Sequence, residues 1–192
     1  MTLRSDKLAS MDEPVTPKGR RTREALLDAG AAIAEQRGLA GLSVAAVTAH
    51  AGVAKGTFYV HFPDRDAFID ALHQRFYARV SDAVAQAVQG LAPGRELLLT
   101  AIDAYLDVCL NNRAVKALVL ETRAKGELTT TMEQREAMFA ELAQPSLQAM
   151  GIKPAAISAR LFVAMTSEAA LIELEAGRRV RGARETIRAL AR

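Results

Sequence analysis

Apolar side chains recur along this chain at three- and four-residue intervals, the spacing that places them on one face of a helix. The first stripe predicts a helix that runs to about Arg37 and is ended by Gly38 and Gly41. The second predicts a long helix that is capped by Asp64 and extends to Gln89. The two stripes consist of Leu26, Ala29, Gly30 and Ile33, and of Phe68, Leu72, Phe76, Val80, Val84 and Val88.

The second half of the chain continues this helical pattern and shows no strand alternation. Turn-forming residues divide it into predicted helices at 95–111, 113–125, 128–149, 154–176 and 182–191. Pro145 falls inside the third of these, where it should kink or split the helix. The pattern therefore predicts an all-α chain.

Residues 43–62, with the sequence SVAAVTAHAGVAKGTFYVHF, contain two short apolar-periodic segments. Ser43 is a good helix cap, and the apolar positions after it keep helical spacing as far as Ala51. Gly52 tolerates the positive φ of a helix end, and Val53 can turn inward, so a short turn would hold the two segments at a steep angle. The stretch therefore predicts a helix-turn-helix.

The second segment of this helix-turn-helix has two very different faces. Phe58 and Phe62 lie four residues apart and share the core side. The outer face offers a bare backbone, two hydroxyls, an ammonium group and a methyl-bearing side chain, where a helix that only had to be soluble would carry Lys, Glu or Gln. Such a surface suits close approach to phosphates and base edges. Its residues are Lys55, Gly56, Thr57, Tyr59, Val60 and His61.

The run from Leu42 to Phe62, which contains AGVAKGTFYVHF and is followed by DRDAF at 64–68, resembles the TetR/AcrR family of bacterial transcriptional regulators. The resemblance covers residues from about Arg20 to Phe68. It implies a three-helix DNA-binding domain followed by a helical bundle for ligand binding and dimerisation. We expect Ser43 and Arg65 to join the outer face of the second segment in contacting DNA.

Three positions depart from the family pattern. Thr48 stands where a small Ala is usual, and Val60 stands where Tyr or another polar residue is frequent. Ala54 replaces the Ser that commonly caps the recognition helix, a loss that should weaken this helix by ~1 kcal/mol.

The charge of the chain is concentrated in the same region. The net charge is +3, and seven basic against four acidic side chains between Lys18 and Arg65 account for the whole excess. A local positive field favours binding of a polyanion, although a solvated charged surface has the same composition. The basic cluster of Lys18, Arg20, Arg21 and Arg23 either reaches the minor groove or backbone of DNA, or serves as a solubilising leader. We expect a mobile arm at 1–17, a DNA-binding domain at 18–63 and a regulatory domain at 64–192.

Several functional classes are disfavoured. The single cysteine, Cys109, excludes an intramolecular disulfide and any Cys-rich zinc site. No uninterrupted apolar run approaches the ~20 residues of a membrane span, so we expect a cytoplasmic protein without a membrane partner. Two of the three histidines, His50 and His61, lie in the DNA-binding part, which leaves no catalytic or metal constellation. We therefore expect neither an enzyme nor a resident cofactor.

The body of a TetR-like protein is expected to hold a mostly apolar ligand chamber. Glu168 shares a helical face with apolar residues and is the notable candidate, because a buried carboxylate needs a partner. A cationic ligand, an arginine across a subunit interface, or solvent could each supply that partner. Cys109 is either a thiol sensor or an ordinary small core residue. The candidate lining residues are Tyr105, Cys109, Glu121, Met132, Met138, Phe139, Phe162, Met165 and Glu168.

By resemblance, the two C-terminal helices pair with those of a second copy, and two reading helices one DNA turn apart then read a palindrome. The leading hypothesis is a dimeric regulator, a repressor that a small molecule releases from its operator. One alternative is an architectural or cell-division-linked DNA-binding protein of the same fold, controlled by a protein partner. A second alternative is a small-molecule carrier or enzyme with a vestigial DNA-binding part.

Overall fold

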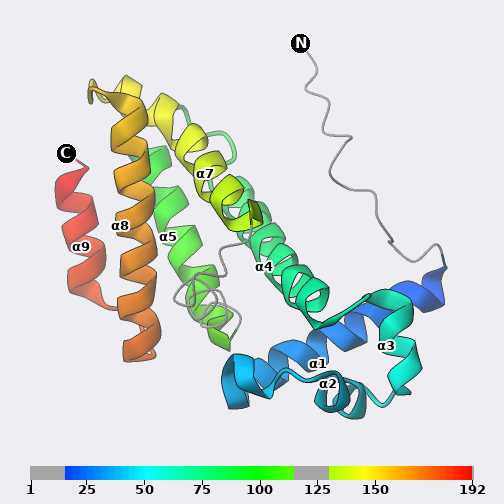
Figure 1. Cartoon of the computed structure of the whole chain (residues 1–192). Helices are drawn as coiled ribbons and strands as arrows, with labels where there is room; N and C mark the ends of the chain where they lie inside the picture. Colours follow the sequence, from blue (N-terminus) through cyan, green and yellow to red (C-terminus); the bar gives the residue numbers. More distant parts are fainter. Residues whose placement is uncertain (1–15, 115–129, 192) are drawn as a thin grey trace. The chain divides into compact units, whose positions relative to one another are not determined.

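The computed structural model describes residues 16–114 and 130–191, with side-chain detail in the second range from residue 134 (Figure 1). Within these residues the chain forms eight helices and no strand, which confirms the all-α prediction. The chain divides into two compact units, Met1–Leu72 and His73–Arg192. The helices are α1 (Pro17–Gly41), α2 (Val44–Ala51), α3 (Lys55–His61), α4 (Arg65–Ala87), α5 (Arg95–Asn111), α7 (Thr130–Ala149), α8 (Ala155–Ala176) and α9 (Arg181–Leu190).

Local signals set the helix ends in the first unit. The Ser43 side chain caps α2 by accepting a hydrogen bond from the Ala46 N–H at 3.2 Å, and Asp64 accepts one from the Ala67 N–H at 2.8 Å. Gly52 ends α2 with a φ of 67°, the left-handed conformation that glycine adopts without strain. Gly38 interrupts α1 with a φ of 60°, one residue beyond the predicted end of that helix. The predicted loss of the cap at Ala54 is confirmed, because no side chain caps α3.

Three phenylalanines form the centre of the first unit. The Phe58 ring of α3 lies 5.3 Å from the Phe68 ring of α4, and the Phe62 ring lies 5.0 Å from Phe68, measured between centroids. All three rings are buried. Phe68 also packs against α1 at Gly30, because a Cβ built there would lie only 2.5 Å from the ring. This cluster holds α1, α3 and the start of α4 together.

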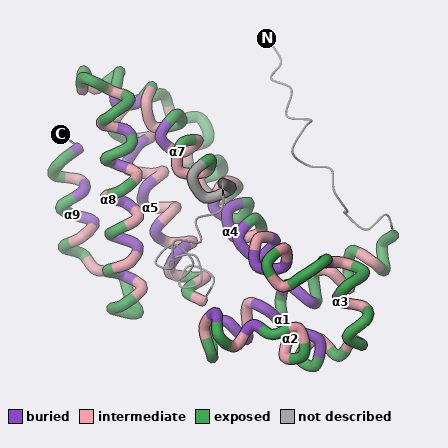
Figure 2. The backbone as a smooth tube through the Cα atoms, viewed as in Figure 1, coloured by how far each residue is buried: buried purple, intermediate pink, exposed green. Residues whose placement is uncertain are grey.

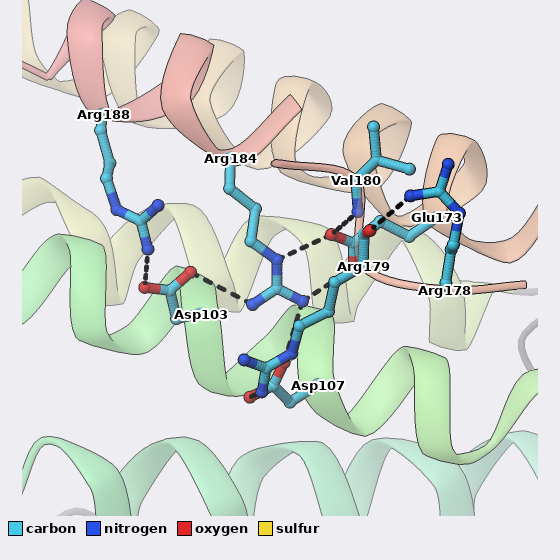
Figure 3. A network of polar contacts seen from close by, with 8 residues as sticks. All are labelled: Asp103, Asp107, Glu173, Arg178, Arg179, Val180, Arg184 and Arg188. Atoms are coloured by element: carbon cyan, nitrogen blue, oxygen red, sulfur yellow. Dashed lines mark hydrogen bonds and ion pairs between the residues drawn. The ribbon is translucent and has the colours of Figure 1, made fainter. Parts of the chain in front are cut away.

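In the second unit, α5, α7 and α8 pack against one another, and α9 packs along α8 (Figure 1). A network of ion pairs joins α5, α8 and α9 (Figure 3). The Arg184 guanidinium of α9 donates two hydrogen bonds of 2.7 Å to the Glu173 carboxylate of α8. It also lies within salt-bridge distance of Asp103 and Asp107 on α5.

The centre of this network is inaccessible to water. The Glu173 and Arg184 side chains are only 1% and 7% exposed. Burial alone would raise the pKa of Glu173, but hydrogen bonds from Arg184 and from the Val180 N–H lower it below its ordinary value. Both charges therefore stay ionised and mutually satisfied. Removing one partner of such a buried pair costs about 3–5 kcal/mol, so the pair constrains the position of α9 strongly.

Several predictions about the second unit can be compared with the structure. The predicted helix at 113–125 lies almost entirely outside the described residues. Pro145 does not split its helix, because α7 continues through it. Among the described helices, α8 alone is long and apolar enough by length and composition to cross a membrane. This helix packs against α5, α7 and α9, and it contributes Glu173 to the buried ion pair.

Replacing Gly30 by Ala should destabilise the protein by about 1–3 kcal/mol, because the added methyl group overlaps the buried Phe68 ring. Gly56→Ala is the matched control in the same unit. Its Cβ meets nothing within 4 Å, so the ordinary helix preference for Ala should stabilise α3 by roughly 0.5–1 kcal/mol. Urea unfolding followed by circular dichroism measures both effects. Equal changes of the same sign in the free energies of unfolding of the two variants would contradict the packing at Gly30.

Lowering the pH from 6.5 towards 4 should reduce the free energy of unfolding, and His73 should contribute to this loss. Burial lowers the pKa of His73 to about 4, and neither ring nitrogen has a hydrogen-bond partner among the described residues. In this pH window the unfolded chain binds a proton that the folded chain does not, so stability falls as pH falls, by up to about 3 kcal/mol for this group.

Urea unfolding at a series of pH values tests this pH dependence, with His73→Leu as the comparison. The variant should lose less stability than the parent between pH 6.5 and 4. Parallel pH profiles for the two proteins would show that His73 is not responsible.

Candidate nucleic-acid interface and ligand cavity

Helix α3 is buried at Phe58 and is exposed or half-buried at its other residues (Figure 2). Val60, on the side opposite Phe58, is 77% exposed, and Tyr59, whose ring lies 5.6 Å from the Phe58 ring, is 50% exposed. Lys55 and Gly56 are exposed, and Thr57 and His61 are half-buried. The structure thus brings together on one short helix the six residues that the sequence placed on the outer face.

Gly56 is unusual because nothing in the fold requires a glycine at this position. It lies inside α3, has no positive φ, and a Cβ built on it would meet no atom within 4 Å. A glycine in a helix is less stable than alanine by about 1 kcal/mol, so the chain carries a cost here without a packing reason. The close approach of an external partner to the helix backbone would be a reason for a glycine here.

His61 stands at the edge of this face. Burial, and then the positive charge of Arg23, lower the pKa of His61 below 6.5. The imidazole is therefore mainly neutral at pH 7 and can form hydrogen bonds without adding a positive charge. Lys55 is the lysine of this face.

Two residues that we expected to contact DNA make bonds within the unit. The Arg65 guanidinium donates hydrogen bonds to the Leu42 and Leu39 carbonyls, at 2.6 and 2.8 Å. These bonds tie the start of α4 to the segment between α1 and α2. Ser43 uses its hydroxyl to cap α2. Both residues therefore position the helix-turn-helix.

The basic cluster lies in a helix, because Lys18, Arg20 and Arg21 are exposed on the first turns of α1, which Thr16 caps. Arg23 differs from them, since its guanidinium stacks over the Phe62 ring at 5.1 Å from the centroid. Three of the four bases are thus free to face a polyanion. Residues 1–15 of the predicted arm at 1–17 lie outside the described residues, and its last two residues, Thr16 and Pro17, cap and begin α1.

The sequence pattern of the bacterial regulatory proteins of the tetR family matches residues 26–72, which span all of α2 and α3 with most of α1 and the start of α4. The chain belongs to the TetR/AcrR family of transcriptional regulators. The HTH-type transcriptional repressor DhaR of Mycobacterium sp. (strain GP1) is 29% identical over 119 residues, a region that covers 58% of this chain and 60% of the repressor.

Solved structures support the fold over nearly the whole chain. A TetR-like transcriptional regulator from Rhodococcus sp. RHA1 superposes with a TM-score of 0.76 at 20% identity, covering 88% of this chain and 93% of its own. A second transcriptional regulator from Rhodococcus sp. Rha1 gives a TM-score of 0.77, also at 20% identity, with 88% and 95% coverage. The TetR/AcrR fold therefore extends through both units.

The second unit of this TetR/AcrR protein contains a cavity of about 480 Å³ between α4, α5, α7 and α8. Its walls are mostly apolar, with four aromatic rings and a few hydroxyl groups. The lining residues are Tyr77, Ser81, Val84, Ala85, Val88, Leu97, Leu98, Ala101, Ile102, Tyr105, Glu136, Met138, Phe139, Leu142, Ala143, Phe162, Val163, Thr166 and Ser167.

Four of the nine candidate ligand residues lie on this wall: Tyr105, Met138, Phe139 and Phe162. Cys109, Met165 and Glu168 do not line it, and Glu121 and the Met132 side chain lie outside the described residues. Glu168 is exposed on α8, while the buried carboxylate of that helix is Glu173. In the single chain Glu168 is therefore in contact with solvent, which is one of the three alternatives that the sequence left open. Cys109 is buried in α5, as expected of a small core residue.

Tyr105 was identified from the sequence, but the other hydroxyl residues of the cavity, Ser81, Thr166 and Ser167, were missed. Tyr105 hydrogen-bonds with Ser167 and Cys109, and burial raises its pKa well above 10. The Thr166 hydroxyl donates to the Phe162 carbonyl at 2.7 Å. Ser81 is different, because its Oγ is shielded from solvent and has no hydrogen-bond partner among the described residues. Ser81 comes from α4, and Thr166 and Ser167 come from α8. A pattern within a single helix therefore does not reveal that these small polar residues line one cavity.

Proposed function

We propose that this TetR/AcrR protein is a dimeric cytoplasmic repressor that binds a palindromic operator through α3 and releases it when a small molecule fills the cavity. The observation that carries the proposal is the division of α3 into a buried Phe58 side and an open side with Gly56, Tyr59 and Val60. DNA contacts come from the outer face of α3 and from Lys18, Arg20 and Arg21 on α1. Ser43, Arg23 and Arg65 support that surface from within the unit.

The cavity supports control by a small molecule over control by a protein partner, because a closed body without a cavity would suit the architectural alternative. An apolar chamber with a few polar groups is the usual form of a ligand site. The mechanism is a population shift. The ligand binds the conformation with mis-spaced reading helices more tightly than the DNA-binding conformation, and its differential affinity sets how far the equilibrium moves. The protein performs no catalysis in this scheme.

A second copy of the chain is the partner that we propose for the outer side of α8. Ile157, Leu161 and Ile172 are exposed there and recur at helical spacing, and Leu190 is exposed on α9. A two-fold axis through this surface would place the same apolar residues of both copies together. Two copies would then present two α3 helices to half-sites ~34–36 Å apart. Glu168 and Arg160, both exposed on α8, are suited to the rim of such an interface.

Lys55→Ala should weaken binding to all DNA sequences and lower the salt dependence of binding, by about 0.9 in log–log slope for each phosphate that the protein no longer neutralises. Tyr59→Phe and Thr57→Val should also change sequence preference, because hydroxyl contacts to base edges carry specificity. Fluorescence anisotropy with fragments of the protein's own promoter region, and with shuffled fragments, measures both effects.

The matched control for this experiment is Lys153→Ala, which removes the same charge from an exposed position outside the first unit. It should leave the salt slope unchanged. Retained DNA affinity in the Lys55 and Tyr59 variants would overturn the assignment of α3 as the reading helix. Equal weakening on all sequences by all three variants would overturn direct base readout.

Leu161→Glu should convert the dimer to a monomer and abolish tight binding to a full palindrome. The Leu161 side chain is 65% exposed in the single chain, so a charge there does not disturb the core, but it would be buried without a partner in the dimer. Sedimentation velocity and circular dichroism check assembly and folding separately. Gln148→Glu introduces the same charge on the exposed side of α7 and should remain dimeric. A dimeric Leu161→Glu variant would place the interface elsewhere.

A further inference from the structure

The polar groups of the cavity are gathered at one end of it. Along α4 the lining residues are first Tyr77 and Ser81, and then only apolar residues as far as Val88. Along α5 the polar residue is Tyr105, and the positions back to Leu97 are apolar. At 1.5 Å per residue these stretches span about 16 Å and about 12 Å of helix, so the gradient extends over the length of an elongated molecule.

The other two helices show the same gradient. On α7, Glu136 is followed by Met138, Phe139, Leu142 and Ala143, and on α8 the hydroxyls of Thr166 and Ser167 follow Phe162 and Val163. The polar ends meet, because Tyr105 hydrogen-bonds with Ser167 and interacts electrostatically with Glu136. The Phe139 ring links them, lying 6.4 Å from Tyr77 and 6.2 Å from Tyr105. Each helix thus contributes a polar residue to one end and an apolar wall to the other.

Among the described residues, the polar end carries no positive charge. None of the nineteen described lining residues is Lys, Arg or His, and the one ionisable carboxyl group is that of Glu136. An anionic head group placed here would lose its hydration without gaining a cationic partner, and it would be repelled by Glu136. A cationic head group has little to gain, because Glu136 is already engaged within the chain. The wall is therefore suited to an uncharged head group.

The Ser81 hydroxyl supplies an anchor for such a head group. The Tyr105, Thr166 and Ser167 hydroxyls have partners within the chain. Ser81 lines the cavity, and its Oγ, which is shielded from solvent, has no hydrogen-bond partner among the described residues, so a turn of the side chain about χ1 would present it to a ligand. A buried hydroxyl without a hydrogen bond is unfavourable, and a ligand that bonds to it removes that cost.

We propose that the effector of this regulator is an uncharged amphiphile, an apolar chain or ring system with one hydrogen-bonding group, held with that group at Ser81 and its apolar part towards Val88 and Leu97. The inference rests on the proposed function for its regulatory meaning, but the binding itself does not require DNA. Affinity should grow with apolar length by up to about fourfold for each added methylene until the cavity is filled.

Three probes with the same chain separate the classes of head group: 1-decanol, decanoate and decyltrimethylammonium. Each is titrated calorimetrically into the full-length protein at pH 7.5, with the alcohols below their solubility limits and the charged probes below their critical micelle concentrations. 1-Decanol should bind at least tenfold more tightly than either charged probe, and 1-hexanol should bind more weakly than 1-decanol. Equal or tighter binding of decanoate or of decyltrimethylammonium would overturn the proposal.

Two variants on α4 test whether binding occurs in the cavity. Both alanines are exposed, but Ala85 lines the cavity, whereas Ala87 lies two residues further round the helix and does not line it. Ala85→Trp should reduce the 1-decanol affinity at least tenfold, and Ala87→Trp should leave it unchanged. Equal affinities for the two variants would show that the probe binds elsewhere and would overturn the proposal.

Ser81→Ala tests the anchor with two readouts of opposite sign. The variant should bind 1-decanol about fivefold more weakly, while the melting temperature of the free protein stays the same or rises, because an unsatisfied buried hydroxyl is removed. Ser81→Thr should restore part of the affinity. A merely structural role would lower the melting temperature, and that result, or unchanged affinity, would remove Ser81 from the site.

Release of a promoter fragment is measured with the same probes to separate this inference from the proposed function. Cavity binding of 1-decanol without release of DNA would uphold the ligand class and overturn effector control. If decanoate released the DNA and Ala85→Trp abolished that release, control by a cavity ligand would be upheld. The proposed class of ligand, an uncharged amphiphile, would then be overturned.

Discussion

The outer face of α3, which we propose to contact DNA, depends on the packing of Phe58, Phe62 and Phe68 against one another. Helix α3 has only seven residues and no side-chain cap, so it is too short to be stable by itself. Its position comes from a single buried ring, Phe58, that packs against Phe62 and Phe68 within 5.4 Å between centroids. Because one face is committed to that contact, the opposite face must project outward. Arg23 over the Phe62 ring and Arg65 on the Leu39 and Leu42 carbonyls fix the surroundings of the cluster.

In the second unit, the helices α5 and α8 each contribute to both the ion-pair network and the cavity. Helix α5 directs Asp103 and Asp107 into the ion-pair network of α9, and it lines the cavity with Ala101, Ile102 and Tyr105. Helix α8 likewise contributes Glu173 to the network and Phe162 to the cavity. A ligand that entered the cavity would therefore contact walls whose helices, α5 and α8, the ion-pair network also holds. Movement in response to it would be expected in the less constrained walls, α4 and α7.

The sequence predicted the parts of the structure that local chemistry determines. The cap at Ser43, the left-handed Gly52 and the alternation of buried and open positions on α3 all follow from residues within one turn of each other. Contacts between distant residues were not predictable in this way. Arg65 bonds to carbonyls more than twenty residues earlier, and the buried carboxylate of α8 is Glu173 instead of Glu168 because Arg184 of α9 meets it there. Small hydroxyl residues such as Ser81 resemble surface positions until four helices are placed around one cavity.

Gly56 and Ser81 are two residues that each lower the stability of the free protein. Gly56 gives up helix stability where no atom would crowd a side chain, and Ser81 buries a hydroxyl that no group in the described chain satisfies. Each is unfavourable for the free protein, and each becomes favourable once an external group occupies the adjacent space: a DNA backbone beside Gly56, a ligand hydroxyl or carbonyl beside Ser81. Proteins that are otherwise locally consistent tend to depart from the rules at functional sites. One departure lies on the reading helix and the other in the cavity, and these are the two sites whose affinities a ligand-controlled regulator must couple.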